Sequence, residues 1–197
     1  SNTPVDVTGI STAQTVAVGG NHICVSLADG TARCWGNGGA GRLGNGSNLA
    51  QEYPVVVSGL TDALTISAEN DHSCALLAGG VARCWGSALL GRLAAGPGDQ
   101  TSNVPQVVAG LADATFFAAG PGRSCAVNAD ASVSCAGFGA GSGGFESLTA
   151  VSGVTGVSSV TMGLNHSCAR TTAAGALCWG FNDDGQLGRV ADAGVVQ

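Results

Sequence analysis

Short apolar runs separated by turn residues recur along the chain, and the clearest example lies between Gly20 and Gly36. This stretch has the pattern of an apolar strand, a short turn and a second strand that ends in Cys-Trp-Gly. The same pattern returns at residues 70–86, in a weaker form at 122–137, and at 165–180. No window places apolar residues at helical spacing over three turns, so the pattern predicts strands and excludes a helical repeat.

The repeat is marked by pairs of cysteines, and the two members of each pair are ten residues apart. The first cysteines of successive pairs follow at intervals of 50, 51 and 43 residues. A unit of about 50 residues that contains four strands is typical of a propeller blade. We therefore predict an all-β, propeller-type repeat protein of four blades, each mostly a four-stranded antiparallel sheet. The chain is expected to form a single repeat domain, 1–197, with blade hairpins at about 15–44, 65–94, 115–144 and 159–188.

A β-rich segment that starts with Pro precedes the first three units, and Pro4–Val7 is the first of these segments. Residues 3–8 and 194–197 therefore look like pieces of the same strand at the two ends of the chain. Such terminal strands are expected to close a ring or to join a neighbouring chain. An open arc would leave strand edges and apolar faces exposed, which favours four blades that close on themselves or pair with another copy.

Composition and charge narrow the possible partners. Hydrophobic residues make up 45% of the chain and charged residues only 10%. Acidic groups outnumber basic ones by 13 to 7, all the basic groups are Arg, and no basic cluster exists. Binding to nucleic acid or to an anionic membrane needs such a cluster, so both are disfavoured. No apolar run approaches the length of a membrane span, so membrane insertion is not expected.

The cysteine pairs predict disulfides. Within each predicted hairpin the two cysteines stand opposite each other, and opposed residues of antiparallel strands have Cα atoms about 4.5 to 5.5 Å apart. A disulfide can span that distance. We expect four bridges within blades: Cys24–Cys34, Cys74–Cys84, Cys125–Cys135 and Cys168–Cys178. Disulfides persist in oxidising compartments, so the expected location is extracellular, on the cell surface or periplasmic.

The motifs together resemble a known family. The order Gly-x-x-His, apolar strand, Gly turn, Cys-Trp-Gly-x-Asn and Gly-Gln-Leu-Gly is similar to the regulator-of-chromosome-condensation repeat, the blade of a β-propeller; the best matches run from His22 to Gly44 and from His166 to Gly188. The third unit departs from the pattern at Arg123 and Ala136. The resemblance implies rings that usually have seven blades, and histidines whose rings form hydrogen bonds within the blade. The expected structural blade contacts are His22, His72, His166, Trp35, Trp85 and Trp179.

Other chemistry finds little support in the sequence. His22, Cys24 and Cys34 offer three zinc ligands, but their spacing is unusual for a zinc site and a fourth ligand is missing. The chain has no Gly-x-Ser-x-Gly elbow and no His-Glu-x-x-His motif. We expect no metal, no cofactor and no enzymatic activity.

The function predicted from these observations is a secreted or surface scaffold, stabilised by disulfides, that binds another protein through loops that differ between the units. These loops are residues 44–52, 94–103 and 137–146, and the candidate binding residues are Arg42, Asn48, Arg92, Asp99, Phe138 and Phe145. The alternative is a structural module of an extracellular assembly or filament, and formation of a homo-oligomer is compatible with both.

Overall fold

The computed structural model describes residues 2–98, 100–138 and 147–189, and within them four antiparallel sheets follow one another along the chain. Each sheet is one blade, and its strands pair in chain order. The predicted all-β fold of four propeller blades is confirmed. Blade 1 holds β1 (Ala13–Val18), β2 (His22–Leu27), β3 (Ala32–Gly36) and β4 (Gln51–Val56); blade 2 holds β5 (Ala63–Glu69), β6 (His72–Leu77), β7 (Ala82–Gly86) and β8 (Ser102–Val107). Blade 3 holds β9 (Phe116–Gly120), β10 (Arg123–Val127), β11 (Val133–Gly137) and β12 (Thr149–Ala150); blade 4 holds β13 (Val157–Met162), β14 (His166–Thr171) and β15 (Ala176–Gly180).

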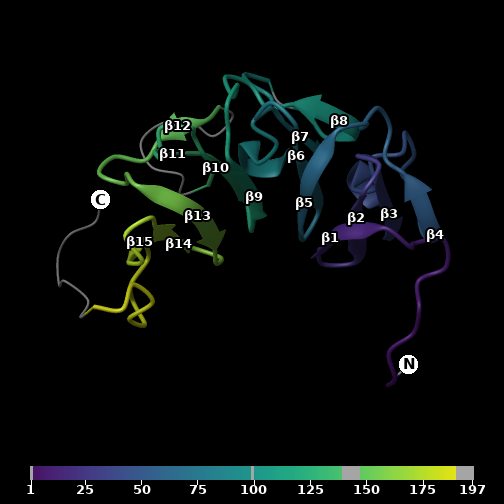
Figure 1. Ribbon diagram of the computed structural model, residues 1–197, viewed down its shortest axis with the longest axis horizontal. Helices are drawn as coiled ribbons and strands as arrows, with labels where there is room; N and C mark the ends of the chain where they lie inside the picture. The colour runs from purple at the N-terminus through teal and green to yellow at the C-terminus, as the bar shows by residue number, and fades with distance from the viewer. Residues whose placement is uncertain (1, 99, 139–146, 190–197) are drawn as a thin grey trace.

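The blades form an open arc (Figure 1). The first strand of each blade, β1, β5, β9 and β13, lies on the concave side, and β4, β8 and β12 lie on the convex side (Figure 1). Blades 1 and 4 stand at opposite ends of the arc, so the four blades of one chain form no closed ring here, and the alternative expectation, pairing with another copy, stays a prediction. Each blade is separated from the next by a layer of apolar side chains.

Strands were expected at residues 3–8 and 194–197, and the structure describes only the first of these two segments. Residues 3–8 form no strand. Residues 194–197 lie outside the described residues. Among the described residues no helix is long and apolar enough to cross a membrane.

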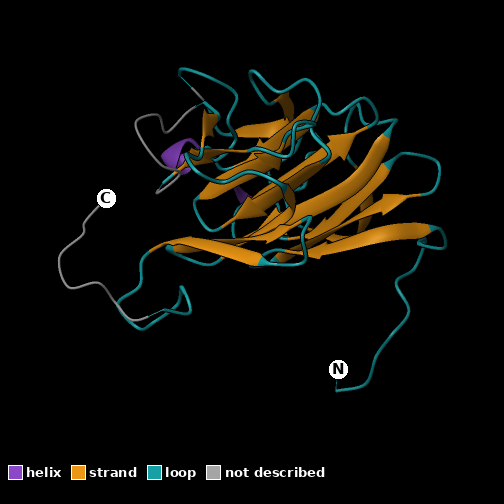
Figure 2. Ribbon diagram, turned by 60° about the vertical axis from the view of Figure 1, so that its left-hand side comes forward, coloured by secondary structure: helices purple, strands orange, loops and turns teal. Residues whose placement is uncertain are grey.

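Three apolar clusters hold the arc together, one at each boundary between neighbouring blades. The cluster between blades 1 and 2 joins Cys24, Cys34 and Leu43 of blade 1 to Ile66 and Trp85 of blade 2. Equivalent clusters join blade 2 to blade 3 and blade 3 to blade 4. We call each such boundary a joint, and Figure 2 shows the strands of the blades layered across these joints.

Candidate functional site

A hydrogen-bonded chain of polar groups crosses the first joint beside its apolar cluster. His22 Nε2 of blade 1 lies 2.7 Å from Ser73 Oγ of blade 2. Ser73 Oγ donates to the carbonyl oxygen of Arg42, in the loop of blade 1, at 3.1 Å. Because the serine proton is used in this bond, His22 donates its Nε2–H to the serine, which fixes the neutral tautomer.

The same arrangement repeats at the next joints. His72 Nε2 lies 3.3 Å from Ser124 Oγ, which donates to the carbonyl oxygen of Arg92 at 2.7 Å. At the third joint Arg123 replaces the histidine, and its Nη1 donates to Ser167 Oγ at 3.2 Å. The family resemblance implied histidine hydrogen bonds within the blade. In the structure the bonds of His22 and His72 run to the following blade instead. The three serines were missed in the sequence, although each directly precedes the first cysteine of its unit.

Burial keeps both of these histidines neutral. Desolvation, with a smaller contribution from the nearby Arg42 charge, lowers the pKa of His22 to about 4. Desolvation and the Arg92 charge lower the pKa of His72 to about 3. The Nδ1 atoms of both rings are buried without a hydrogen-bond partner among the described residues. Protonation would place a charge in a largely desolvated environment, so the rings remain neutral and are suited to holding blades together.

Arg42 and Arg92, expected in binding loops, are instead buried in the joints, with 9% and 6% of their surfaces exposed. Arg42 forms a salt bridge of 2.8 Å with Asp71 of the next blade. Its Nε donates to the carbonyl oxygen of Gly39, and Arg92 makes the same bond to Leu89. The sequence showed both arginines in Gly-rich loops, but not that these loops fold back over the neighbouring blade.

The tryptophans of the repeats occupy different environments. Trp85 is fully buried between blades 1 and 2, and its Nε1–H donates to the carbonyl oxygen of Arg42 at 2.9 Å. Trp35 and Trp179 are half-buried, and His166 is half-buried as well. The repeat position alone therefore does not decide how deeply the ring lies.

The four expected disulfides are present. Each joins directly opposed residues of the second and third strand of a blade, with a Cα–Cα distance of 4.1 Å. A loop closed by cysteines ten residues apart stabilises a fold by about 3 kcal/mol on the chain-entropy model. No group of three or more His, Cys, Asp and Glu residues suitable for a metal occurs in the described part of the chain.

Exposed apolar side chains gather at one end of the blades. This is the end at which the third strand of each blade stops, and we call it the loop end. The turns between the first and second strands lie at this end too, because Val18 pairs with Ile23 and His22 with Gly36. The loop that joins the third strand to the fourth strand of a blade also begins at this end. It contains a 3-10 turn at Gly39–Gly41 in blade 1 and at Leu89–Gly91 in blade 2. Loops held on a rigid scaffold are where binding residues concentrate.

Large apolar side chains project from the loop end of blades 2, 3 and 4 at positions that blade 1 fills with small or polar residues, although blade 1 exposes Leu49, at 71%, elsewhere in its loop. At the same repeat positions blade 1 has Gly39, Ala40, Asn37 and Gly20. Leu90 and Phe138 come from different blades, and both lie within 4 Å of the point that a Cβ on Gly122 would occupy. The exposed apolar residues of this surface are Leu89 (65%), Leu90 (44%), Phe138 (44%), Leu164 (67%) and Phe181 (53%), and we call them the apolar loop cluster.

Leu90 is held in a costly backbone conformation. Its φ is +67°, in the left-handed region that non-glycine residues adopt at a cost of about 1–2 kcal/mol. Ala40 has the same conformation in blade 1, so the turn imposes it. Glycine would relieve the strain, yet blade 2 carries a leucine whose side chain remains largely in solvent. Such an outlier points to a role outside the fold.

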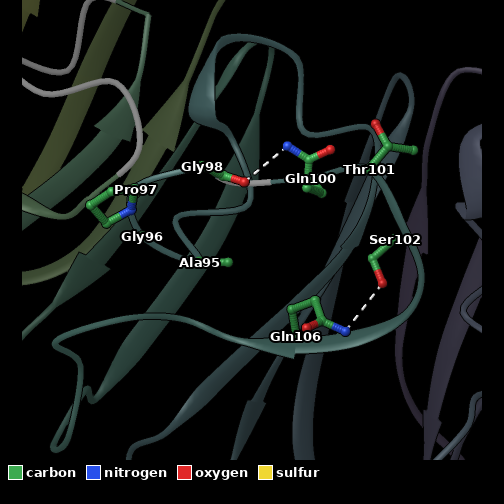
Figure 3. Close-up of a pocket in the computed structure, with 8 residues that line it drawn as sticks. All are labelled: Ala95, Gly96, Pro97, Gly98, Gln100, Thr101, Ser102 and Gln106. Carbon is green, nitrogen blue, oxygen red and sulfur yellow. Dashed lines mark hydrogen bonds between the residues drawn. The ribbon is translucent and has the colours of Figure 1, made fainter.

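Of the remaining predicted binding residues, Asn48 is exposed in the loop of blade 1, whereas Asp99 and Phe145 lie outside the described residues. The loop of blade 2 surrounds an open hollow of about 300 Å³ lined by residues 95–98, 100–102 and 106 (Figure 3). Its polar groups already bond to one another: Gln106 Nε2 donates to Ser102 Oγ at 3.1 Å, and Gln100 Nε2 donates to the Gly98 carbonyl at 3.0 Å. The hollow therefore presents few unused polar groups to a ligand.

Comparison with known proteins finds a family whose repeat parts of this chain match. Two models described as the regulator of chromosome condensation (RCC1) repeat match the chain, one at residues 29–76 and the other at residues 13–42 and 157–186. No curated protein sequence matches it.

Solved structures share the fold at low sequence identity. Human WBSCR16 superposes with a TM-score of 0.81 at 22% identity, over 92% of this chain and 51% of that one. Yeast Prp20p, studied for its binding to Gsp1p and histones, superposes with a TM-score of 0.80 at 23% identity, over 94% of this chain and 50% of that one. The same yeast protein bound to Kap60 superposes with a TM-score of 0.78 at 23% sequence identity, over 91% of this chain and 46% of that one. The chain thus spans about half the length of the structures that it matches.

Proposed function

We propose that this chain, which carries matches to the RCC1 repeat and has the fold of an RCC1-type propeller arc, is a scaffold that binds another protein at the loop end of blades 2 to 4. The observation that carries the proposal is the apolar loop cluster. Five large apolar side chains are exposed at one end of three successive blades. Leu90 and Phe138 approach a common point beside Gly122, and exposed apolar patches on a protein mark interaction sites.

The strained Leu90 and its neighbour Phe138 supply the centre of the proposed contact. Aromatic and large aliphatic anchors at the middle of an interface contribute most of its binding free energy. The turn that carries Leu90 is held by the bond from Arg92 Nε to the Leu89 carbonyl, and Phe138 directly follows Gly137 at the end of β11, so both anchors start from fixed backbone and little conformational entropy is lost on binding. The yeast relative bound to Kap60 is a family member of the same fold that binds a protein, which supports this class of function.

The four disulfides support a location in an oxidising compartment, and we extend the proposal to an extracellular, cell-surface or periplasmic protein. We propose a binding function without catalysis.

Site-specific photo-crosslinking tests the proposed face. A photoreactive phenylalanine replaces Phe138 in one sample and Val107 in the other. Val107 is the matched control because it is also about half exposed, at 51%, but lies at the opposite end of blade 2. In the native environment, position 138 should yield a covalent adduct with a distinct protein that position 107 does not yield. Identical adduct patterns, or none at position 138, would overturn the proposal.

A further inference from the structure

The turn between β9 and β10 lacks the side chain that the other blades carry at the same place. Pro121 and Gly122 are the two residues between these strands. The φ of Gly122 is +76°, and a proline followed by a glycine with positive φ is the pattern of a type II turn. At the repeat position of Gly122 the other blades have Asn21, Asp71 and Asn165. Blade 3 therefore has bare backbone where the other blades have a polar side chain.

This bare backbone is the floor of a small apolar notch, which we define by Leu90, Gly122 and Phe138. A Cβ atom placed on Gly122 would lie 3.4 Å from Leu90 Cδ1 and 3.9 Å from Phe138 Cβ. Apart from the chain neighbours of the glycine, no other atom of the described residues comes within 4 Å of this point. Both distances are ordinary carbon–carbon contacts, so the notch has room for one carbon group such as a methyl.

Backbone contacts hold the two walls of the notch in place. The N–H of Phe138 donates to the carbonyl oxygen of Gly122 at 2.9 Å. Gly137 permits this close approach, because a Cβ at that position would collide with the same oxygen. The 3-10 turn that forms the other wall is held by the bond from Arg92 Nε to the Leu89 carbonyl, at 2.7 Å. The notch therefore needs little ordering when a partner binds.

Arg123 fixes the floor of the notch, since it directly follows Gly122 in the chain. Its Nη1 donates to Ser167 Oγ at 3.2 Å, and its Nη2 donates to the carbonyl oxygen of Leu164 at 2.9 Å. The residue is 1% exposed. These bonds tie the turn to blade 4 and keep the guanidinium engaged there, so the two walls that face the notch are carbon.

We propose that the notch receives an aliphatic side chain of the protein partner, and that Gly122 is the residue that determines this specificity. The inference rests on the proposed function, since the notch lies within the apolar loop cluster. A polar or charged group placed between carbon walls would lose hydration without gaining a hydrogen bond. A side chain that ends in a methyl group, as in Leu, Ile, Val or Met, buries apolar area against both walls. The edge of an aromatic ring is broader than a methyl group and needs more room.

Peptide selection on the whole chain identifies the preferred side chain. The probe is a displayed library of random linear peptides, and the peptides retained are those that bind the wild-type chain but not the double variant Leu90→Ser, Phe138→Ser. Each retained peptide should contain one aliphatic residue whose replacement by Ala lowers the affinity ~tenfold or more. A charged, polar or aromatic residue in that role would overturn the inference. This scan needs only the wild-type chain and the double variant.

Filling the notch tests the role of Gly122 directly. Gly122→Ala places a Cβ in the notch, and Gly110→Ala is the matched control. Gly110 has nearly the same φ, +75°, nothing lies within 4 Å of its Cβ point, and it is in the connection that leaves β8 at the end opposite to the loop end. The two substitutions therefore impose similar backbone strain, but only the first fills the notch.

The affinity of the retained peptides should fall ~tenfold or more for Gly122→Ala and stay unchanged for Gly110→Ala. A peptide whose aliphatic residue is already Ala should lose no further affinity for Gly122→Ala, because the two changes remove the same contact. If the library gives no peptide that depends on Leu90 and Phe138, the proposed function fails and the inference fails with it. If such peptides bind Gly122→Ala as tightly as Gly110→Ala, the proposed function stands and the inference alone is wrong.

Discussion

His22 donates a hydrogen bond to Ser73 across 2.7 Å, although the two residues belong to different blades and lie 51 positions apart in the chain. Related bonds recur at the two following joints, with Arg123 replacing the histidine in the last. The polar chains, together with the Arg42–Asp71 salt bridge, fix the relative position of blades that also share apolar clusters. They explain how a chain with few charged residues positions its blades.

Removing the serine hydroxyl of the first joint should destabilise the fold. In Ser73→Ala the Nε2–H of His22 is left buried without an acceptor, which costs about 1–3 kcal/mol. Chemical denaturation monitored by tryptophan fluorescence measures this loss. Ser11→Ala, at an exposed position, is the control and should change stability very little. Equal stabilities of the two variants would refute the structural role assigned to Ser73.

Stability should depend on pH through the buried histidines. The pKa of His22 is lowered to about 4 and that of His72 to about 3, so the unfolded chain binds protons below pH 6.5 that the folded chain does not. The free energy of unfolding therefore falls as the pH falls from about 6.5 toward 4, by at most about 1.4 kcal/mol per pH unit for each histidine.

Urea unfolding between pH 4.5 and 6.5 checks this dependence. The double variant His22→Gln, His72→Gln keeps an N–H donor at each joint but does not titrate in this range. It should show a flatter slope of stability against pH, whatever its absolute stability. A slope equal to that of the wild-type chain would show that other groups cause the pH dependence.

The disulfides should differ in their resistance to reduction in the folded protein. Cys24–Cys34, Cys74–Cys84 and Cys125–Cys135 are completely buried at the joints, whereas Cys168–Cys178 is partly exposed. A reductant reaches the exposed bridge without opening a joint. Timed alkylation with mass spectrometry should therefore find Cys168 and Cys178 labelled first. Simultaneous labelling of all the pairs would contradict the assigned burial.

Much of the fold could be predicted from the sequence because the same pattern occurs four times, so each copy supports the interpretation of the others. The interval between Cys24 and Cys34 determines the hairpin register, and four copies of that interval determine the number of blades. The sequence could not show that Arg42 folds under the neighbouring blade, because this depends on the path of a Gly-rich loop in space. Nor could it decide between a ring and an arc, since residues 3–8 have the same pattern as β4 whether or not a partner strand is present.

The candidate site was only partly visible in advance. Phe138 was predicted, but Leu89, Leu90, Leu164 and Phe181 were not. Their signal was the contrast between equivalent loop positions: blade 1 has small or polar residues where the later blades have Leu and Phe. The exposure of these side chains and the left-handed conformation of Leu90 became apparent only in the structure.

The most direct test of the proposed function compares the proteins retained by three immobilised baits from the native environment of the chain. The baits are the wild-type chain, the double variant Leu90→Ser, Phe138→Ser, and the control Val107→Ser. Since central apolar anchors carry most of the binding free energy, at least one protein held by the wild-type and control baits should fall ~tenfold or more on the double variant. Circular dichroism establishes that all the baits are folded. If the double variant retains the same proteins in the same amounts, the loop end of blades 2 to 4 is not the binding site.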